Sequence, residues 1–247
     1  MAEHAQHSPM AQFEVKPIFP LQLAGHDISY TNASLFMTLA VVAVVLFLAA
    51  GMRKRALVPG RFQSMAELSY EFVTNMIKDN IGASGRQYFP IIFTLFMFVI
   101  TCNLLGMLPY SFTVTSQIVV TFAFAAMVFL GVTTIAFVRH GVDFLKFFVP
   151  AGAPGWIAPL MVFIELLAYL ARPVTLSVRL AANMMAGHTM LKVIGGFVVA
   201  LGFTLGWMPF LLLTLLTGFE IFVAVLQAYI FTVLVCVYLN DALHLHH

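Results

Sequence analysis

Residues 156–205 read WIAPLMVFIELLAYLARPVTLSVRLAANMMAGHTMLKVIGGFVVALGFTL, an apolar run of 50 residues that few charged side chains interrupt. About 18 apolar residues are enough to cross the hydrocarbon core of a bilayer, which is ~30 Å thick. At about 1.5 Å per residue, a single helix of this length would be roughly 75 Å long. The run therefore predicts either two membrane spans or one long helix that lies strongly tilted in the membrane.

A second overlong run extends from Phe210 to Leu239, after a turn predicted at Trp207 and Pro209. It also exceeds the length of about 20 residues that an upright span needs. Two overlong neighbours favour a hairpin of two strongly tilted helices.

Three shorter apolar runs precede this region and predict further membrane spans. They cover Ser34–Gly51, with Asn32 as the expected N-cap, Phe89–Leu108 and Gln117–Val138. The sequence thus predicts an all-α polytopic membrane protein with about five membrane helices.

The remaining parts of the chain are more polar. Residues 1–31 predict a polar N-terminal segment that is loose or lies on the surface, and Gly and Pro residues predict a loop at 140–155. Residues 32–247 are expected to form a single membrane domain.

The composition supports a membrane location. Hydrophobic residues make up 62% of the chain and charged residues 9%, whereas soluble domains carry about 25% charged residues. The net charge of +2, with its basic residues scattered, argues against nucleic acid as a partner. Cys102 and Cys236 lie in apolar runs and are expected to be packing residues rather than a disulfide.

Residues 62–80, FQSMAELSYEFVTNMIKDN, predict an amphipathic helix rather than a span. The apolar members, which recur at three- and four-residue spacing, are Phe62, Met65, Leu68, Phe72, Val73, Met76 and Ile77. Such a helix lies at the inner membrane surface or packs on a partner protein.

Basic residues beside the spans predict the orientation. Those that follow the first span are Arg53, Lys54, Arg55 and Arg61. By the positive-inside rule, this end stays in the cytoplasm and the N-terminus lies outside. Arg139, His140 and Lys146 likewise place the end of the third span inside.

Polar side chains inside the two long runs point to an ion path. An ionisable group at the bilayer centre costs about 3 kcal/mol or more, so such groups rarely face lipid. The ionisable members are Glu165, Arg172, Arg179, His188, Lys192 and Glu220, with Asn183 and Gln227 as polar companions.

The spacing places these groups on defined helix faces. Glu165, Arg172 and Arg179 recur at seven-residue intervals and share one face. Asn183 extends that face by one turn. His188, nine residues beyond Arg179, faces a different neighbour.

On the last run, Glu220, Ala224 and Gln227 share a face by the same rule. The small side chain of Ala224 would let another segment approach closely.

Structural roles stay open for most of these residues. Arg172 and Lys192 could extend to the interface, Glu165 could pair with Arg172, and His188 could be a satisfied hydrogen-bonding residue. Arg179 differs, because it stays protonated and the nearest acid on its face, Glu165, is about 21 Å away. Its counter-ion must come from another helix or another subunit.

Four segments resemble subunit a of the rotary F-type ATP synthase, in a bacterial, alphaproteobacterial or mitochondrial-like form. They are RPVTLSVRLAANMMAGH (172–188), FEIFVAVLQAYIFTVL (219–234), NLLGMLPYSFT (103–113) and VPGRFQSMAEL (58–68). Their order and spacing match along nearly the whole chain from Ser34 onward.

The resemblance implies a stationary proton-channel subunit that has two half-channels and binds no nucleotide itself. Arg179 matches the fixed positive charge opposite the ion-carrying carboxylate of a rotating c-ring. Asn183 and Gln227 match polar residues near that arginine, and Glu165 matches an acid of an access route.

His188 and Glu220 match a coupled pair that some family members carry in exchanged positions. Gly106 stands where some bacterial members have an acid, which argues against a role for an acid there. The resemblance implies as partners the c-ring, b-type peripheral stalk subunits, other synthase subunits and membrane lipid. We expect no cofactor or metal, a location in the bacterial inner membrane, and a cytoplasmic C-terminus.

The main alternative is a secondary ion transporter or antiporter, which would share the buried charges. Such a protein should show internal repeats and helices broken near the midplane, for which Pro173 and Gly195–Gly196 are candidates. A haem-bearing subunit would need paired axial ligands, and only His188 lies well inside a span. A structural scaffold would not need Arg179.

Overall fold

The computed structural model describes residues 12–20, 22–23, 26–27, 29–53, 56, 58–108, 111–148 and 157–244. Its α-helices are α2 (Asn32–Met52), α3 (Arg61–Asn80), α4 (Phe89–Gly106), α5 (Ile118–His140), α6 (Ala158–Leu205) and α7 (Trp207–Leu243). Short 3-10 helices are η2 (Ala83–Tyr88), η3 (Val114–Ser116) and η4 (Gly141–Phe148). Within the described residues, five helices are long and apolar enough to cross a membrane, namely α2, α4 with η2, α5, α6 and α7. The predicted polytopic helical membrane fold is therefore confirmed.

The 50-residue apolar run forms one long helix rather than two spans. α6 extends over 48 residues and has a kink at Gly202, three residues before its end, where a φ of 59° is accessible at little cost without a Cβ. The chain turns back between Gly202 and Gly206. Trp207 and Pro209, where the turn was predicted, instead lie in the first turn of α7, so that prediction was a few residues late.

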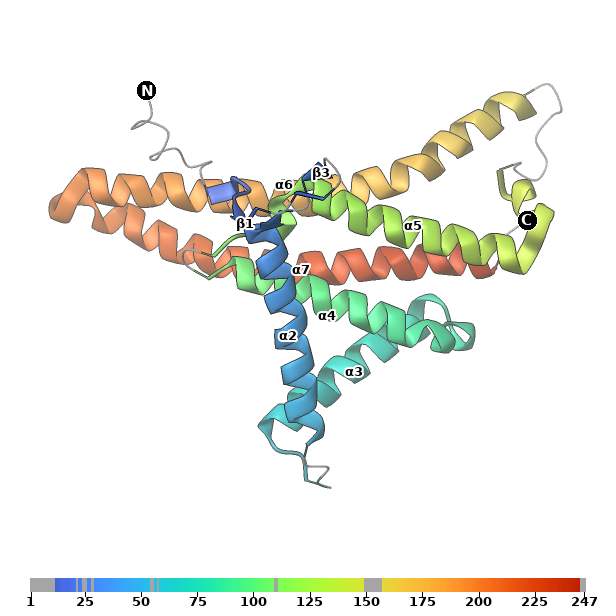
Figure 1. The fold of residues 1–247 in the computed structure, drawn as a ribbon, viewed down its shortest axis with the longest axis horizontal. Helices are drawn as coiled ribbons and strands as arrows, with labels where there is room; N and C mark the ends of the chain where they lie inside the picture. The colour runs from blue at the N-terminus through green and yellow to red at the C-terminus, as the bar shows by residue number, and fades with distance from the viewer. Residues whose placement is uncertain are drawn as a thin grey trace.

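The four C-terminal helices lie across the first span. Figure 1 shows α6 and α7 side by side as a hairpin, with α4 beside α7 and α5 beside both long helices. In the same view α2 crosses the direction of the hairpin. α2 has the length of an upright span, 21 residues, whereas α6 and α7 extend over 48 and 37 residues, and this excess length is what the predicted tilt rests on.

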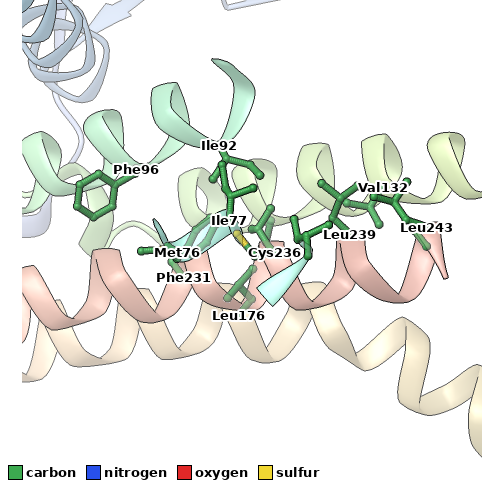
Figure 2. Close-up of a cluster of buried hydrophobic side chains, with 14 of the residues drawn as sticks. Met76, Ile77, Ile92, Phe96, Val132, Leu176, Phe231, Cys236, Leu239 and Leu243 are labelled. Atoms are coloured by element: carbon green, nitrogen blue, oxygen red, sulfur yellow. The ribbon is translucent and has the colours of Figure 1, made fainter. Parts of the chain in front are cut away.

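The hydrophobic core lies where α3, α4, α5 and α6 meet α7. The side chains labelled in Figure 2 are Met76 and Ile77 of α3, Ile92 and Phe96 of α4, Val132 of α5, Leu176 of α6, and Phe231, Cys236, Leu239 and Leu243 of α7. Cys102 and Cys236 are buried and free, which confirms their packing role. One side of the α6–α7 hairpin packs in this core against α3, α4 and α5, whereas the side that faces away from these helices is exposed.

The amphipathic segment is the helix α3, and it is buried at one end only. Val73, Met76 and Ile77 pack into the core, whereas Phe62 and Leu68 near its beginning are 64% and 65% exposed. The helix therefore packs on this chain's own core, and it leaves an apolar surface uncovered nearer to α2.

The N-terminal segment is more ordered than expected. Its strands form two antiparallel pairs, β1 (Pro17–Phe19) with β4 (Tyr30–Thr31) and β2 (Gln22–Leu23) with β3 (His26–Asp27). The side chain of Asn32 accepts a hydrogen bond from Lys16 N–H at 3.1 Å and donates one to the Glu14 carbonyl at 3.0 Å. This described part is therefore tied to the start of α2, and residues 15–19 of it are exposed on the surface.

The cap of α2 also differs from the prediction. The hydroxyl of Thr31, not the side chain of Asn32, accepts the hydrogen bond from the Ser34 N–H. Asn32 is already helical, and its amide is used instead to hold the N-terminal segment.

The first half of the predicted loop at 140–155 is a 3-10 helix, η4. Phe144 and Phe148 are buried there, with ring centroids 6.1 Å and 5.5 Å from that of Tyr169 on α6. Packing of these aromatic rings outweighs the turn signals of the sequence. The rest of that loop, residues 149–156, lies outside the described residues, as do Lys54 and Arg55.

Candidate functional site

A groove of about 610 Å³ lies between α6 and α7. Its polar lining residues are Arg179, Asn183, Glu220 and Gln227. Apolar side chains and small residues, including Ala186 and Gly187, form the rest of the lining. Four of the six predicted site residues therefore meet in one place.

Arg179 lies in this groove with its side chain exposed. Among the described residues it forms no ion pair. Its main-chain carbonyl accepts a 3.0 Å hydrogen bond from Nε2 of the buried Gln227. The amide thus ties α7 to the backbone of α6 at the arginine, and the guanidinium remains available to a charge from outside this chain.

His188 and Glu220 form the buried part of the site. His188 Nδ1 lies 3.6 Å from Glu220 Oε1, with side chains 12% and 7% exposed. Both carboxylate oxygens of Glu220 are buried without a hydrogen-bond partner among the described residues. A buried carboxylate that lacks hydrogen bonds is costly, and the imidazole beside it is a group that can accept and release a proton.

The close approach of Glu220 to α6 depends on Gly187. A Cβ at this glycine would lie 2.6 Å from Glu220 Oε1 and 2.9 Å from its Cδ. The glycine therefore makes the space in which the carboxyl group reaches His188, one residue further along α6.

The sequence analysis missed two polar residues of this region. The hydroxyl of Thr113 lies 3.1 Å from His188 Nε2. Asn103 of α4 is fully buried and donates a 2.9 Å hydrogen bond to the carbonyl of Ala224 on α7, which uses the close approach expected at that small residue. Both lie in the segment 103–113, one of the four segments with a family resemblance. A buried Thr or Asn, however, has no spacing pattern that would identify it as a site residue.

Of the roles left open for Arg172, pairing with Glu165 is not the one observed. Arg172 pairs with Asp241 near the end of α7, at 3.1 Å, and its guanidinium lies 4.8 Å from the ring centroid of Tyr238. Glu165 is half-buried and does not line the groove. Lys192 is exposed on α6, one turn beyond His188, and its charge acts on the imidazole.

The site contains one group with a permanent charge, the guanidinium of Arg179, and two groups that can exchange protons, His188 and Glu220. A guanidinium stays positive at any working pH and favours an ionised carboxylate nearby, whereas an imidazole and a carboxyl group can accept and release protons. α6 keeps helical dihedrals at Pro173 and at Gly195–Gly196, so it lacks the mid-helix break expected of a secondary transporter.

Comparison with known proteins agrees with this geometry. The model of the family described as "ATP synthase A chain" matches residues 34–240. The chain is 55% identical over 241 residues to the ATP synthase subunit a of Pelagibacter ubique, and 55% identical over 240 residues to that of Ehrlichia canis. Each match covers 97% of this chain and 99% of the relative. The subunit a of a Wolbachia from Brugia malayi is 52% identical over 236 residues, 95% of this chain and 98% of the relative. This chain therefore belongs to the ATP synthase A chain family.

Proposed function

We propose that this chain is the stationary proton-channel subunit of the membrane sector of an ATP synthase. In this role it provides two half-channels and a fixed positive charge, and it couples proton movement to rotation of a c-ring. It binds no nucleotide, so ATP chemistry takes place on partner subunits. The observation that carries the proposal is the exposed Arg179, which forms no ion pair with any residue that the structure describes, in a groove beside the buried His188–Glu220 pair.

In the proposed mechanism, the charge state of the ring carboxylate depends on what surrounds it. In lipid it must be neutral, because ionising it there is expensive. Opposite Arg179 it can ionise, because the guanidinium stabilises the negative charge. The same positive charge blocks a proton from passing directly between the two half-channels. A proton therefore boards the ring on one side and leaves on the other.

The membrane potential sets the direction in which the ring rotates. A charge that falls through 100 mV releases about 2.3 kcal/mol, which turns the ring past the groove. Arg179 forms no lasting bond and only sets where the ring carboxylate can stop.

The half-channels need groups that take up and release protons. We assign Glu220 and His188 to one half-channel, with Asn183 and Gln227 as polar groups near Arg179. Glu165, which does not line the groove, belongs to an access route elsewhere along α6.

The proposed function also implies the partners, the membrane and the orientation of this chain. The partners are the c-ring, b-type peripheral stalk subunits, the other synthase subunits and membrane lipid, in a bacterial inner membrane. The N-terminus lies outside and the C-terminus inside. Contact between His140 Nε2 at the end of α5 and the Ala242 carbonyl at the end of α7, at 3.1 Å, supports a common side for these two ends.

Photo-cross-linking tests the partner of the groove. A photoreactive residue in place of Phe219, which lines the groove and is 61% exposed, should capture a small ring subunit with a membrane carboxylate. Leu46 on α2, 63% exposed, is the matched control and should not capture that subunit. Equal capture from both positions, or capture of lipid alone at Phe219, would remove the ring from the groove.

A substitution at Gly187 tests the proton path. Gly187→Ala places a Cβ where Glu220 Oε1 now lies, so the carboxyl group should swing away from His188. We expect proton flux through the assembled complex in vesicles to fall about tenfold, because misplacement by ~1 Å can cost a transfer step as much as 100-fold. Gly195→Ala on the same helix, where a Cβ meets nothing within 4 Å, should conduct normally. Equal flux in the two variants would contradict the proposed pair.

A further inference from the structure

His188 is held between two partners on opposite sides of its ring. Nδ1 faces Glu220 Oε1 at 3.6 Å, and Nε2 lies 3.1 Å from the hydroxyl oxygen of Thr113. Thr113 precedes η3 and is only 4% exposed. A buried hydroxyl beside one ring nitrogen fixes the ring plane and influences which nitrogen carries the proton.

The Thr113 hydroxyl has a second possible partner, the main-chain carbonyl of Gly106 at the end of α4, at 3.4 Å. This approach depends on the missing side chain of Gly106. A Cβ there would lie 2.8 Å from Thr113 Cγ2 and 3.2 Å from its Oγ1. The absence of a side chain at Gly106 thus makes room for Thr113.

We propose that Thr113 is a positioning residue for proton transfer between Glu220 and His188. Its hydroxyl donates to the Gly106 carbonyl and accepts a hydrogen bond from the Nε2–H of His188. In this arrangement the lone pair of Nδ1 faces Glu220. When the two groups close from 3.6 Å to hydrogen-bond distance, the proton of a neutral Glu220 carboxyl group can move from Oε1 to Nδ1, which leaves a carboxylate beside an imidazolium whose second N–H is already satisfied.

Thr113 does not itself carry the proton onward. Its acceptor is a main-chain carbonyl, which does not take up a proton under these conditions, and a hydroxyl is far less acidic than an imidazolium. Its effect is on the orientation and proton arrangement of His188, so removal of the hydroxyl should slow the transfer without removing either exchanging group.

The inference rests on the proposed function, and a set of threonine variants tests it. Thr113→Val keeps the shape but removes the hydroxyl, and we expect ATP-driven proton pumping in vesicles to fall about tenfold. This is less than the ~100-fold that loss of an acid–base group itself would cost. Thr113→Ser restores the hydroxyl and should restore most of the flux.

Thr232→Val is the matched control. Thr232 is fully buried, and its hydroxyl donates only within its own helix, to the Ala228 carbonyl at 2.8 Å. This variant loses a buried hydroxyl of the same kind but not a contact with His188, so pumping should stay at the original level. A fall equal to that of Thr113→Val would make the effect one of stability and overturn the inference.

Substitutions at Gly106 give a second test that does not rely on removing the hydroxyl. Gly106→Ala should displace Thr113 and lower pumping several-fold. Adding Thr113→Ser to it removes Cγ2, the atom nearest to the new Cβ, and should recover part of the loss. A double variant that is no better than Gly106→Ala would contradict the proposed contact.

Glu220→Gln, measured beside these variants, distinguishes a failure of the role of Thr113 from a failure of the proposed half-channel. Normal pumping by Thr113→Val while Glu220→Gln is blocked would overturn the role of Thr113 alone. Normal pumping by both would overturn the assignment of the half-channel on which that role rests.

Discussion

Vesicles that carry the assembled complex with Arg179→Ala are expected to lose ATP-driven proton pumping almost completely, while passive proton leak persists or rises. Arg179 is exposed in the groove and forms no ion pair among the described residues. Its loss would remove both the charge that lets a ring carboxylate ionise and the barrier between the half-channels. Coupling should therefore fail even though the path for protons stays open.

The measurement compares pumping driven by ATP with flux driven by an imposed gradient. Lys78→Ala removes an exposed cation from α3, outside the groove lining, and should leave coupled pumping intact. If coupled pumping survives Arg179→Ala, the arginine has only a structural role, and the proposed mechanism fails although the family assignment stands.

The second large effect is expected for Glu220→Gln, which should reduce proton flux about 100-fold, as for loss of a positioned acid–base group. The amide has nearly the same shape as the carboxyl group but cannot take up and release a proton. Because neither carboxylate oxygen has a hydrogen-bond partner among the described residues, the change breaks no hydrogen bond that could destabilise the fold.

Assembly is therefore expected to be normal for Glu220→Gln, which is checked by the amount of complex recovered in mild detergent. Glu67→Gln is a suitable control, because Glu67 lies on α3 and its carboxylate accepts a hydrogen bond from Gln63 at 2.8 Å. Normal flux through the Glu220 variant would exclude this residue from the proton path.

The helices could be predicted from the sequence because long apolar runs leave few other structures possible in a membrane. The two overlong helices of the hairpin followed from the length of the last two apolar runs in the same way. The exact reversal point did not, because Trp207 and Pro209 are tolerated in the first turn of a helix, whereas the turn depends on the backbone conformation of Gly202.

The contacts of the candidate site could be predicted from the sequence only in part. Periodicity correctly separated Arg179 from His188, which contacts Glu220 and Thr113 instead of lining the groove. It could not identify the partner of Arg172, because periodicity relates residues within one helix only. The contact with Asp241 depends on the register between α6 and α7, which is set by packing along the whole hairpin.

The Arg172–Asp241 ion pair has a mechanical consequence for the hairpin. The two long helices are joined covalently at the Gly202–Gly206 turn, and this pair joins them again close to the opposite end, with the groove between the two joints. A beam supported at both ends bends less under a side load than one held at a single end. A rotor that presses on the groove would therefore deflect the hairpin little, and its torque would pass to the rest of the stator instead of being lost as elastic strain.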